Sequence, residues 1–115
     1  MARNRASAKK AGTAWETEIV KELVAHGWKY AERRRLSGAQ DKGDIAGVAG
    51  VCIEAKNASR LELASWLDEA EKERSHADAA IGAVWFKRRG KPRAAQGYVL
   101  LDGASFMQLL KEAGY

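Results

Sequence analysis

Two carboxylates and an ammonium group occur in this sequence at a spacing that could bind a divalent metal. Asp44 precedes Glu54 by ten residues, and Lys56 follows Glu54 by two. The stretch between the two acids is typical of a β-hairpin, because short runs rich in Val and Ile flank a loop at residues 48–50. A three-residue loop sets Asp44 opposite Glu54. The side-chain period of two then places Asp44, Glu54 and Lys56 on one face of a sheet.

Phosphodiester hydrolysis is the chemistry that suits these side chains. It needs an activated water, a stabilised pentavalent phosphate and a neutralised leaving group, and a divalent metal can serve all three needs. Magnesium takes carboxylate and carbonyl oxygens, so Asp44, Glu54 and the backbone carbonyl of Ala55 are suitable ligands. Lys56 could position or deprotonate the attacking water and offset charge on the phosphate. A Glu-x-Lys pair alone can equally be an exposed ion pair, and that alternative stays open.

The register of the hairpin decides whether these residues can form a site. A two-residue loop at 49–50 would oppose Ile45 to Glu54 and put Asp44 and Glu54 on opposite faces of the sheet. The site therefore requires the three-residue loop or a bulge. In that register the other face of the hairpin is apolar and carries Ile45, Val51, Ile53 and Ala55.

A third carboxylate, that of Glu16, falls on the apolar side of a predicted first helix. This helix is expected to begin at Thr13 and to end at residues 26–27. Glu16 stands three residues before Ile19 and seven before Leu23, so it shares their buried stripe. A carboxylate that leans inward needs a cation, a hydrogen-bond donor or a metal. Thr13 and Glu16 also match a capping box, and both interpretations of Glu16 stay open.

The charge of the chain is distributed unevenly. The 115 residues are 46% hydrophobic with a net charge of +5, which indicates one domain with a modest core. Residues 1–12 hold four of the five net charges and lack large apolar side chains, so we expect a flexible basic arm followed by a single domain over 13–115. Basic clusters apart from an acidic segment suit binding to a polyanion. The expected DNA contacts are Arg3, Arg5, Lys9, Lys10, Arg33, Arg34, Arg35, Lys42, Arg88, Arg89 and Lys91.

The remaining segments predict a mixed sheet of about five strands flanked by helices, of the α/β (α+β) class, in the order α-β-β-β-α-β-β-α. Strands are expected at 28–33, 81–86 and 96–101. A capping box at 59–62 opens a second helix that ends near Ala77, with its acidic face turned away from DNA. The last helix, 103–113, is expected to pack Phe106, Leu109 and Leu110. The lone Cys52 and the lack of a long apolar run or a leader-like segment predict a soluble, cytoplasmic chain.

Gly43-Asp44 followed by Glu54-Ala55-Lys56 at the end of a hydrophobic strand resembles the PD-(D/E)XK nuclease signature, with Gly43 in place of the proline. Over residues 10–56 the layout is similar to archaeal and phage-type Holliday junction resolvases, which have a basic leader, a helix bearing a Glu and a His-Gly-Trp turn before the Asp. The resemblance implies a restriction-endonuclease-like fold and a Mg²⁺- or Mn²⁺-dependent homodimer of prokaryotic or phage origin that nicks four-way DNA junctions in symmetric pairs. It assigns Glu16 to the site, directly or through a water.

Three functions are therefore considered. The first is a junction-resolving endonuclease active in DNA recombination and repair. The second is another nuclease of the same superfamily, such as a nicking, flap or restriction-type enzyme. The third is a non-catalytic basic module that binds DNA with strong salt dependence and does not cut it.

Overall fold

The computed structural model describes residues 4–35 and 41–115. Arg3, one of the expected DNA contacts, lies outside the described residues. The helices are α1 (Arg5–Ala25), α2 (Leu63–His76) and α3 (Gly103–Glu112), with one 3₁₀ turn, η1 (Ala94–Gln96). The strands are β1 (Glu32–Arg33), β2 (Ile45–Ala46), β3 (Val51–Lys56), β4 (Ile81–Phe86) and β5 (Tyr98–Leu100).

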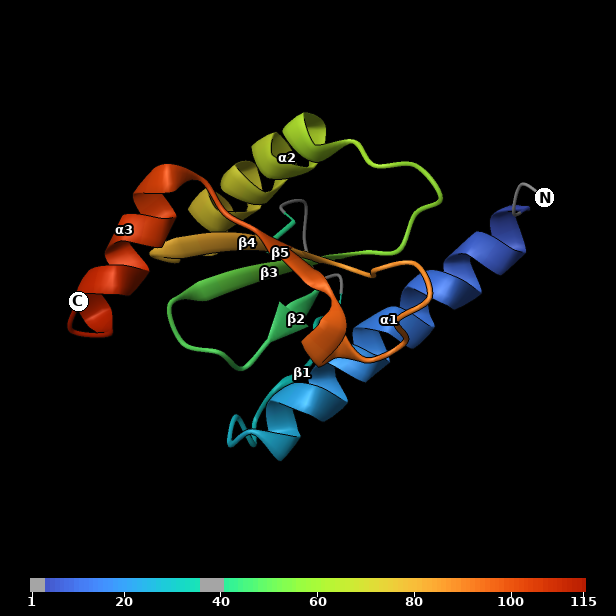
Figure 1. Cartoon of the computed structure of the whole chain (residues 1–115), viewed down its shortest axis with the longest axis horizontal. Coiled ribbons are helices and arrows are strands. Elements are labelled where there is room, and N and C mark those ends of the chain that lie inside the picture. Colours follow the sequence, from blue (N-terminus) through green and yellow to red (C-terminus); the bar gives the residue numbers. More distant parts are fainter. Residues whose placement is uncertain (1–3, 36–40) are drawn as a thin grey trace.

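The five strands form one mixed sheet in the order β1-β2-β3-β4-β5 (Figure 1). β3 and β4 run parallel, with α2 as the crossover between them, and the other neighbours are antiparallel. The predicted α+β class and the order α-β-β-β-α-β-β-α are confirmed. A parallel pair carries its carboxyl ends to the same sheet edge, so Lys56 and Phe86 end side by side.

The two faces of the sheet are covered by different helices. On one face Trp15 and Ile19 of α1 pack against Ile45 and Ile53. On the other face Trp66, Ala70, Val84 and Phe86 form a second buried cluster beneath α2. Because neighbouring residues of a strand alternate between faces, Ile53 faces α1 and Glu54, in register with Val84, faces α2.

The hairpin has the register that the candidate site requires. Ile45 pairs with Ile53, the register in which a regular ladder would set Asp44 opposite Glu54. The amide of Val51 donates to the carbonyl of Val48 at 3.2 Å and closes the three-residue loop. Asp44 itself leaves the regular ladder, since its amide donates to the Ile53 carbonyl at 2.9 Å. The alternative with a two-residue loop is therefore wrong.

The start of the first helix differs from the prediction. α1 begins at Arg5, and the side chain of Asn4 caps it by accepting a hydrogen bond from the Ser7 amide at 2.8 Å. The expected start at Thr13 is wrong, and the residues of the basic arm from Arg5 onward are helical. Ala, Lys and Arg have high helix propensity and need no apolar partner to continue a helix that packs further along.

Three other expectations are corrected. The first strand is confined to Glu32–Arg33, because a turn occupies residues 29–30. α2 begins at Leu63, and its N-cap residue Glu62 makes no capping hydrogen bond through its side chain, so the capping box at 59–62 is wrong. In α3, Phe106 is 53% exposed and Leu109 is 38% exposed. Their predicted packing is wrong, since α3 follows an edge strand and covers little of the sheet.

Candidate metal centre

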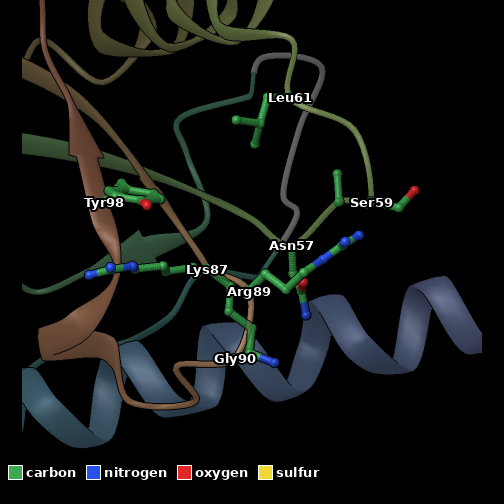
Figure 2. Close-up of a pocket in the computed structure, with 9 residues that line it drawn as sticks. Asn57, Ser59, Leu61, Lys87, Arg89, Gly90 and Tyr98 are labelled. Carbon is green, nitrogen blue, oxygen red and sulfur yellow. The ribbon is translucent and has the colours of Figure 1, made fainter.

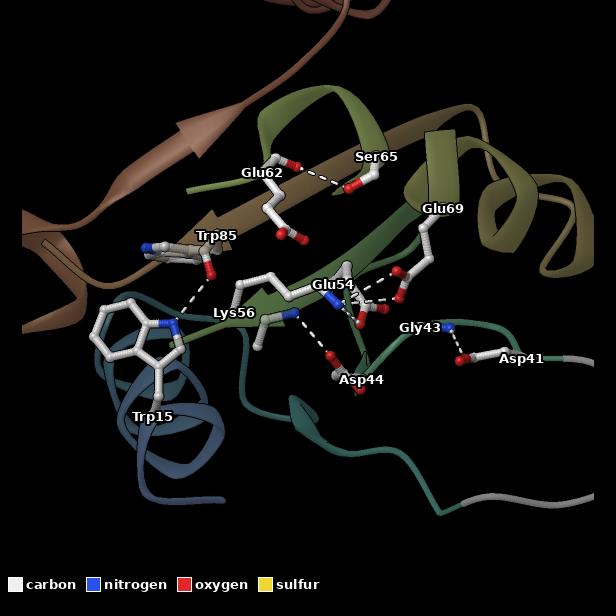
Figure 3. Close-up of polar contacts among 11 residues, drawn as sticks. Trp15, Asp41, Gly43, Asp44, Glu54, Lys56, Glu62, Ser65, Glu69 and Trp85 are labelled. Atoms are coloured by element: carbon white, nitrogen blue, oxygen red, sulfur yellow. Dashed lines mark hydrogen bonds and ion pairs between the residues drawn. The ribbon is translucent and has the colours of Figure 1, made fainter. Parts of the chain in front are cut away.

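The hairpin brings the Asp44 carboxylate to the backbone of β3. Asp44 Oδ2 accepts a hydrogen bond from the Ala55 amide at 2.8 Å (Figure 3). The neighbouring Glu54 points from β3 toward α2 and is only 5% exposed. The pair was predicted from spacing alone, and the structure places the two carboxylates close enough that the charge of Asp44 raises the pKa of Glu54.

Lys56 lies beside Glu54, as its position two residues later predicts, and has a further partner. Its Nζ is 3.6 Å from Glu54 Oε1 and 3.1 Å from Oε1 of Glu69, on α2 (Figure 3). Burial alone would lower the pKa of Lys56, but the hydrogen bond to Glu69 and the charges of Glu54, Glu69 and Asp44 raise it. Lys56 is therefore held as an ammonium ion.

The sequence predicts that the acidic residues of α2 face outward, but in the structure not all of them do. Glu73 is 3% exposed and forms a group with Glu54 and Asp41, in which one carboxylate oxygen of each residue lies within 4.8 Å of the other two. Glu73 and Asp41 were missed by the sequence analysis. A signal existed for Glu73, which stands seven residues after Trp66 and three after Ala70 and so shares their buried stripe.

The electrostatics of the Glu54–Glu73 pair follow from burial. Burial raises the pKa of Glu54, and the hydrogen bond with Glu73 and the charge of Asp44 raise it further. Burial also raises the pKa of Glu73, to which the charges of Asp41 and Glu69 add, while the hydrogen bond with Glu54 opposes the change. Two ionised carboxylates in this position need a counter-charge.

Glu16 approaches the centre from helix α1. It lies in the middle of α1, so the capping-box interpretation is wrong. Its Oε1 is 3.4 Å from Nε of Arg33. Burial and the charge of Asp44 raise the pKa of Glu16, and Arg33 opposes them. Glu16 and Asp44 therefore share one electrostatic environment.

Glu16 and Asp44 also line one pocket of about 730 Å³. Basic side chains from two parts of the chain line it, and the pocket residues with charged side chains are Lys9, Glu16, Arg33, Arg34, Arg35, Asp41 and Asp44. Four of the expected DNA contacts thus lie beside the proposed metal ligands. Arg5, Lys10 and Lys42 are exposed but do not line this pocket.

A second basic pocket, of about 630 Å³, opens at the sheet edge where β3 and β4 end (Figure 2). The amide of Lys87 donates to the carbonyl of Lys56 at 3.0 Å, so this pocket directly adjoins the candidate centre. Its lining includes Asn57, Lys87, Arg88, Arg89 and Tyr98. The guanidinium of Arg88 lies 5.6 Å from the centre of the Tyr98 ring. Lys91 pairs with Arg88 in an isolated bridge and does not line the pocket.

The donor set fits a hard divalent cation. Oxygen ligands are what Mg²⁺ and Mn²⁺ prefer. Glu16 and Glu54 each lie near Asp44, but among the described residues the three acids whose oxygens come within 4.8 Å of one another are Asp41, Glu54 and Glu73. The buried Oε2 atoms of Glu54 and Glu73 accept no hydrogen bond within the described residues, so oxygen ligands are available there.

Comparisons of the chain with models of protein families, with curated proteins and with solved structures find no match. Among the described residues, no helix is long and apolar enough to cross a membrane.

Proposed function

We propose that this chain is a metal-dependent DNA endonuclease, and that its substrate is a four-way DNA junction. The observation that carries this proposal is the position of Asp44, whose charge adds to burial in raising the pKa values of both Glu16 and Glu54. Lys56 lies beside Glu54, and arginines line the pocket that Asp44 shares with Glu16. An ordinary surface ion pair needs none of this arrangement. A hydrolase acting on a polyanion needs acidic metal ligands within a basic surround.

The side chains divide the work of phosphodiester hydrolysis. Mg²⁺ or Mn²⁺ would supply an activated water and a Lewis acid at the phosphate. Asp44 and Glu54 are the proposed ligands, and Asp44 is oriented by the Ala55 amide. The carbonyl of Ala55 and the carboxylate of Glu16, directly or through a water, complete the proposed set. The raised pKa of Lys56 favours a role as a fixed positive charge that stabilises the phosphate over a role as general base.

The two basic pockets suggest how a DNA strand crosses the centre. One pocket, with Lys9 and residues 33–35, lies on the side of α1, and the other, with Arg88 and Arg89, adjoins the carboxyl end of β3. Phosphates on either side of the scissile bond would be held by these side chains. Tyr98 offers an aromatic face in the second pocket.

Paired incisions in a junction call for a homodimer, because a two-fold axis places two identical sites at symmetry-related strands. A candidate surface for a second copy lies on α3 and the edge strand β5. Val99, Phe106 and Met107 are each more than half exposed there, although α3 is amphipathic. A copy of the same face would cover these side chains and the free edge of β5.

The test is cleavage of a labelled four-way junction and of a matched linear duplex, in Mg²⁺, Mn²⁺ or EDTA. The wild type is expected to cut the junction in symmetric pairs with metal and not in EDTA. Asp44→Asn and Glu54→Gln are expected to abolish cutting while binding persists. Glu71→Gln is the matched control, because Glu71 pairs with Arg74 on α2, away from the centre.

Each of the other possible outcomes would change the proposed function in a specific way. Equal cutting of junction and duplex would replace the junction substrate by that of another nuclease of the superfamily. Salt-sensitive binding without any cutting would favour the non-catalytic DNA-binding module. Unchanged cutting by both Asp44→Asn and Glu54→Gln would remove the proposed centre.

A further inference from the structure

A group of three carboxylates lies between β3 and α2, and one of its members, Asp41, also lines the pocket that holds Glu16. Asp41, Glu54 and Glu73 each place one oxygen within 4.8 Å of the others. His76 of α2 holds the chain at Asp41 in place, since its Nδ1 is 2.9 Å from the Asp41 carbonyl oxygen. The group therefore joins the loop before β2, the strand β3 and the helix α2.

Among the residues that the structure describes, two buried oxygens of this group accept no hydrogen bond, although the carboxyl groups of Glu54 and Glu73 are hydrogen-bonded to each other. Glu54 Oε1 is paired with Lys56, but Oε2 of Glu54 and Oε2 of Glu73 are buried and accept no hydrogen bond within the described residues. Both residues are at least 95% buried. Within the same residues, neither Asp41 nor Glu73 forms an ion pair. Unpaired acceptors at such depth are costly, and a ligand is the ordinary remedy.

We propose that Asp41, Glu54 and Glu73 bind a divalent cation between β3 and α2. The PD-(D/E)XK signature contains neither Asp41 nor Glu73. Two oxygens on opposite sides of one cation are at most about 5.2 Å apart for Ca²⁺ and about 4.2 Å apart for Mg²⁺, twice the longest usual metal–oxygen distance of each. The spread of at most 4.8 Å therefore allows a shared ion after a small contraction.

The charge balance around the group supports a cation in preference to more protein contacts. Five carboxyl groups influence one another's ionisation here, those of Asp41, Asp44, Glu54, Glu69 and Glu73. Lys56 is the ammonium group that pairs with two of them, Glu54 and Glu69. Arg34 lines the pocket with Asp41 and Asp44, so the acidic side chains of this neighbourhood still outnumber Lys56 and Arg34. A cation at Glu73 would offset the excess and would hold Glu54 in the orientation that its proposed catalytic role requires.

This position shares Glu54 with the proposed nuclease centre but can be tested apart from it, and its role in cleavage rests on the proposed function. Asp44 belongs to the nuclease centre and is not one of the three ligands. A cation bound through Asp41 and Glu73 should therefore persist in Asp44→Asn, even though that variant is expected not to cut DNA. Loss of cleavage and loss of this cation are distinct results.

The experiment measures Mn²⁺ binding by isothermal titration calorimetry on the full chain without DNA, beside the metal-induced change in Tm. In the Asp44→Asn background, Glu73→Gln and Asp41→Asn are each expected to weaken Mn²⁺ binding by about tenfold or more and to remove the metal-induced rise in Tm. Glu71→Gln is the control on the same helix and should bind Mn²⁺ as its parent does.

Three results would overturn the proposal. The first is that Glu73→Gln and Asp41→Asn both bind Mn²⁺ as tightly as their parent. The second is that the Asp44→Asn protein shows no Mn²⁺ binding that depends on Glu73. The third is that Glu71→Gln loses as much Mn²⁺ binding as the other two variants. If Glu73→Gln does not fold, as circular dichroism would reveal, Asp41→Asn decides the question, because Asp41 is exposed and its substitution leaves the core intact.

Discussion

Glu16 of α1 and Arg33 of β1 meet at 3.4 Å beside the Asp44 carboxylate, although they come from separate elements of the chain. The contact shows that Glu16 serves neither as a helix cap nor as a simple surface charge. It joins the first helix to the strand that begins the sheet, at the wall of the pocket where the proposed ligands lie. Its substitution should therefore separate function from stability.

We expect Glu16→Gln to reduce junction cleavage by about 10- to 100-fold while costing about 1 kcal/mol or less in the free energy of unfolding. The matched control is Glu18→Ala. Glu18 Oε2 accepts a hydrogen bond from the Ala94 amide at 2.8 Å, so its loss should cost about 1–3 kcal/mol and leave the rate of cleavage of the folded protein unchanged. Cleavage rates and urea unfolding measure the two effects. Full activity in Glu16→Gln would remove Glu16 from the centre.

The buried carboxylates should make the stability of the metal-free protein depend on pH. The pKa values of Glu54 and Glu73 are raised above the ordinary 4.5, so the folded chain binds more protons than the unfolded chain. This contribution to the free energy of unfolding is fully present below about pH 4.5 and is lost as pH rises through the folded pKa values. In EDTA, the Tm is expected to fall from about pH 5 to about pH 8.

The Tm of the variant Glu73→Gln should fall less over the same pH range, because this variant lacks one of the two titrating groups. Glu71→Gln should follow the wild type. Parallel melting curves for Glu73→Gln and the wild type at every pH would contradict the assignment of the pH dependence to this pair.

The amino-terminal part of α1 should contribute to DNA binding without contributing to the core. Lys9 is exposed and lines the pocket with Glu16, whereas Lys21 is exposed on the same helix and does not line that pocket. Lys9→Ala is expected to lower affinity for a four-way junction and to reduce the slope of log K against log salt by about 1. Lys21→Ala should change neither. Fluorescence anisotropy over a salt series measures both, and equal effects of the two substitutions would place the DNA elsewhere.

The exposed apolar side of α3 should determine the oligomeric state. Phe106→Glu is expected to convert a dimer into a folded monomer, because it places a charge where a second copy would bury an aromatic ring. Gln108→Glu, also exposed on α3, is the control and should leave the dimer intact. Light scattering after size-exclusion chromatography gives the mass. A wild type that is monomeric at all concentrations, or a Phe106→Glu dimer, would contradict this surface.

Local patterns were enough to predict the hairpin and the first members of the candidate centre. Loop length and the period of two set the register of Ile45 against Ile53, and with it the facing positions of Asp44 and Glu54. The strand Ile81–Phe86 was also predictable, since a run of buried residues bounded by turn signals is a local feature. Helical spacing likewise placed Glu16 on the inner stripe of α1.

Contacts between distant elements decided the rest. Glu73 shares a stripe with Trp66 and Ala70, but only the packing of α2 on β3 brings it to Glu54, and only the loop before β2 brings Asp41 to both. The exposed face of α3 was not predictable either, because the apolar spacing of Phe106 and Leu109 is the same whether a helix covers a core or lies over a sheet edge. Periodicity determines which side of an element is apolar or acidic. What meets that side depends on tertiary packing between residues far apart in the chain.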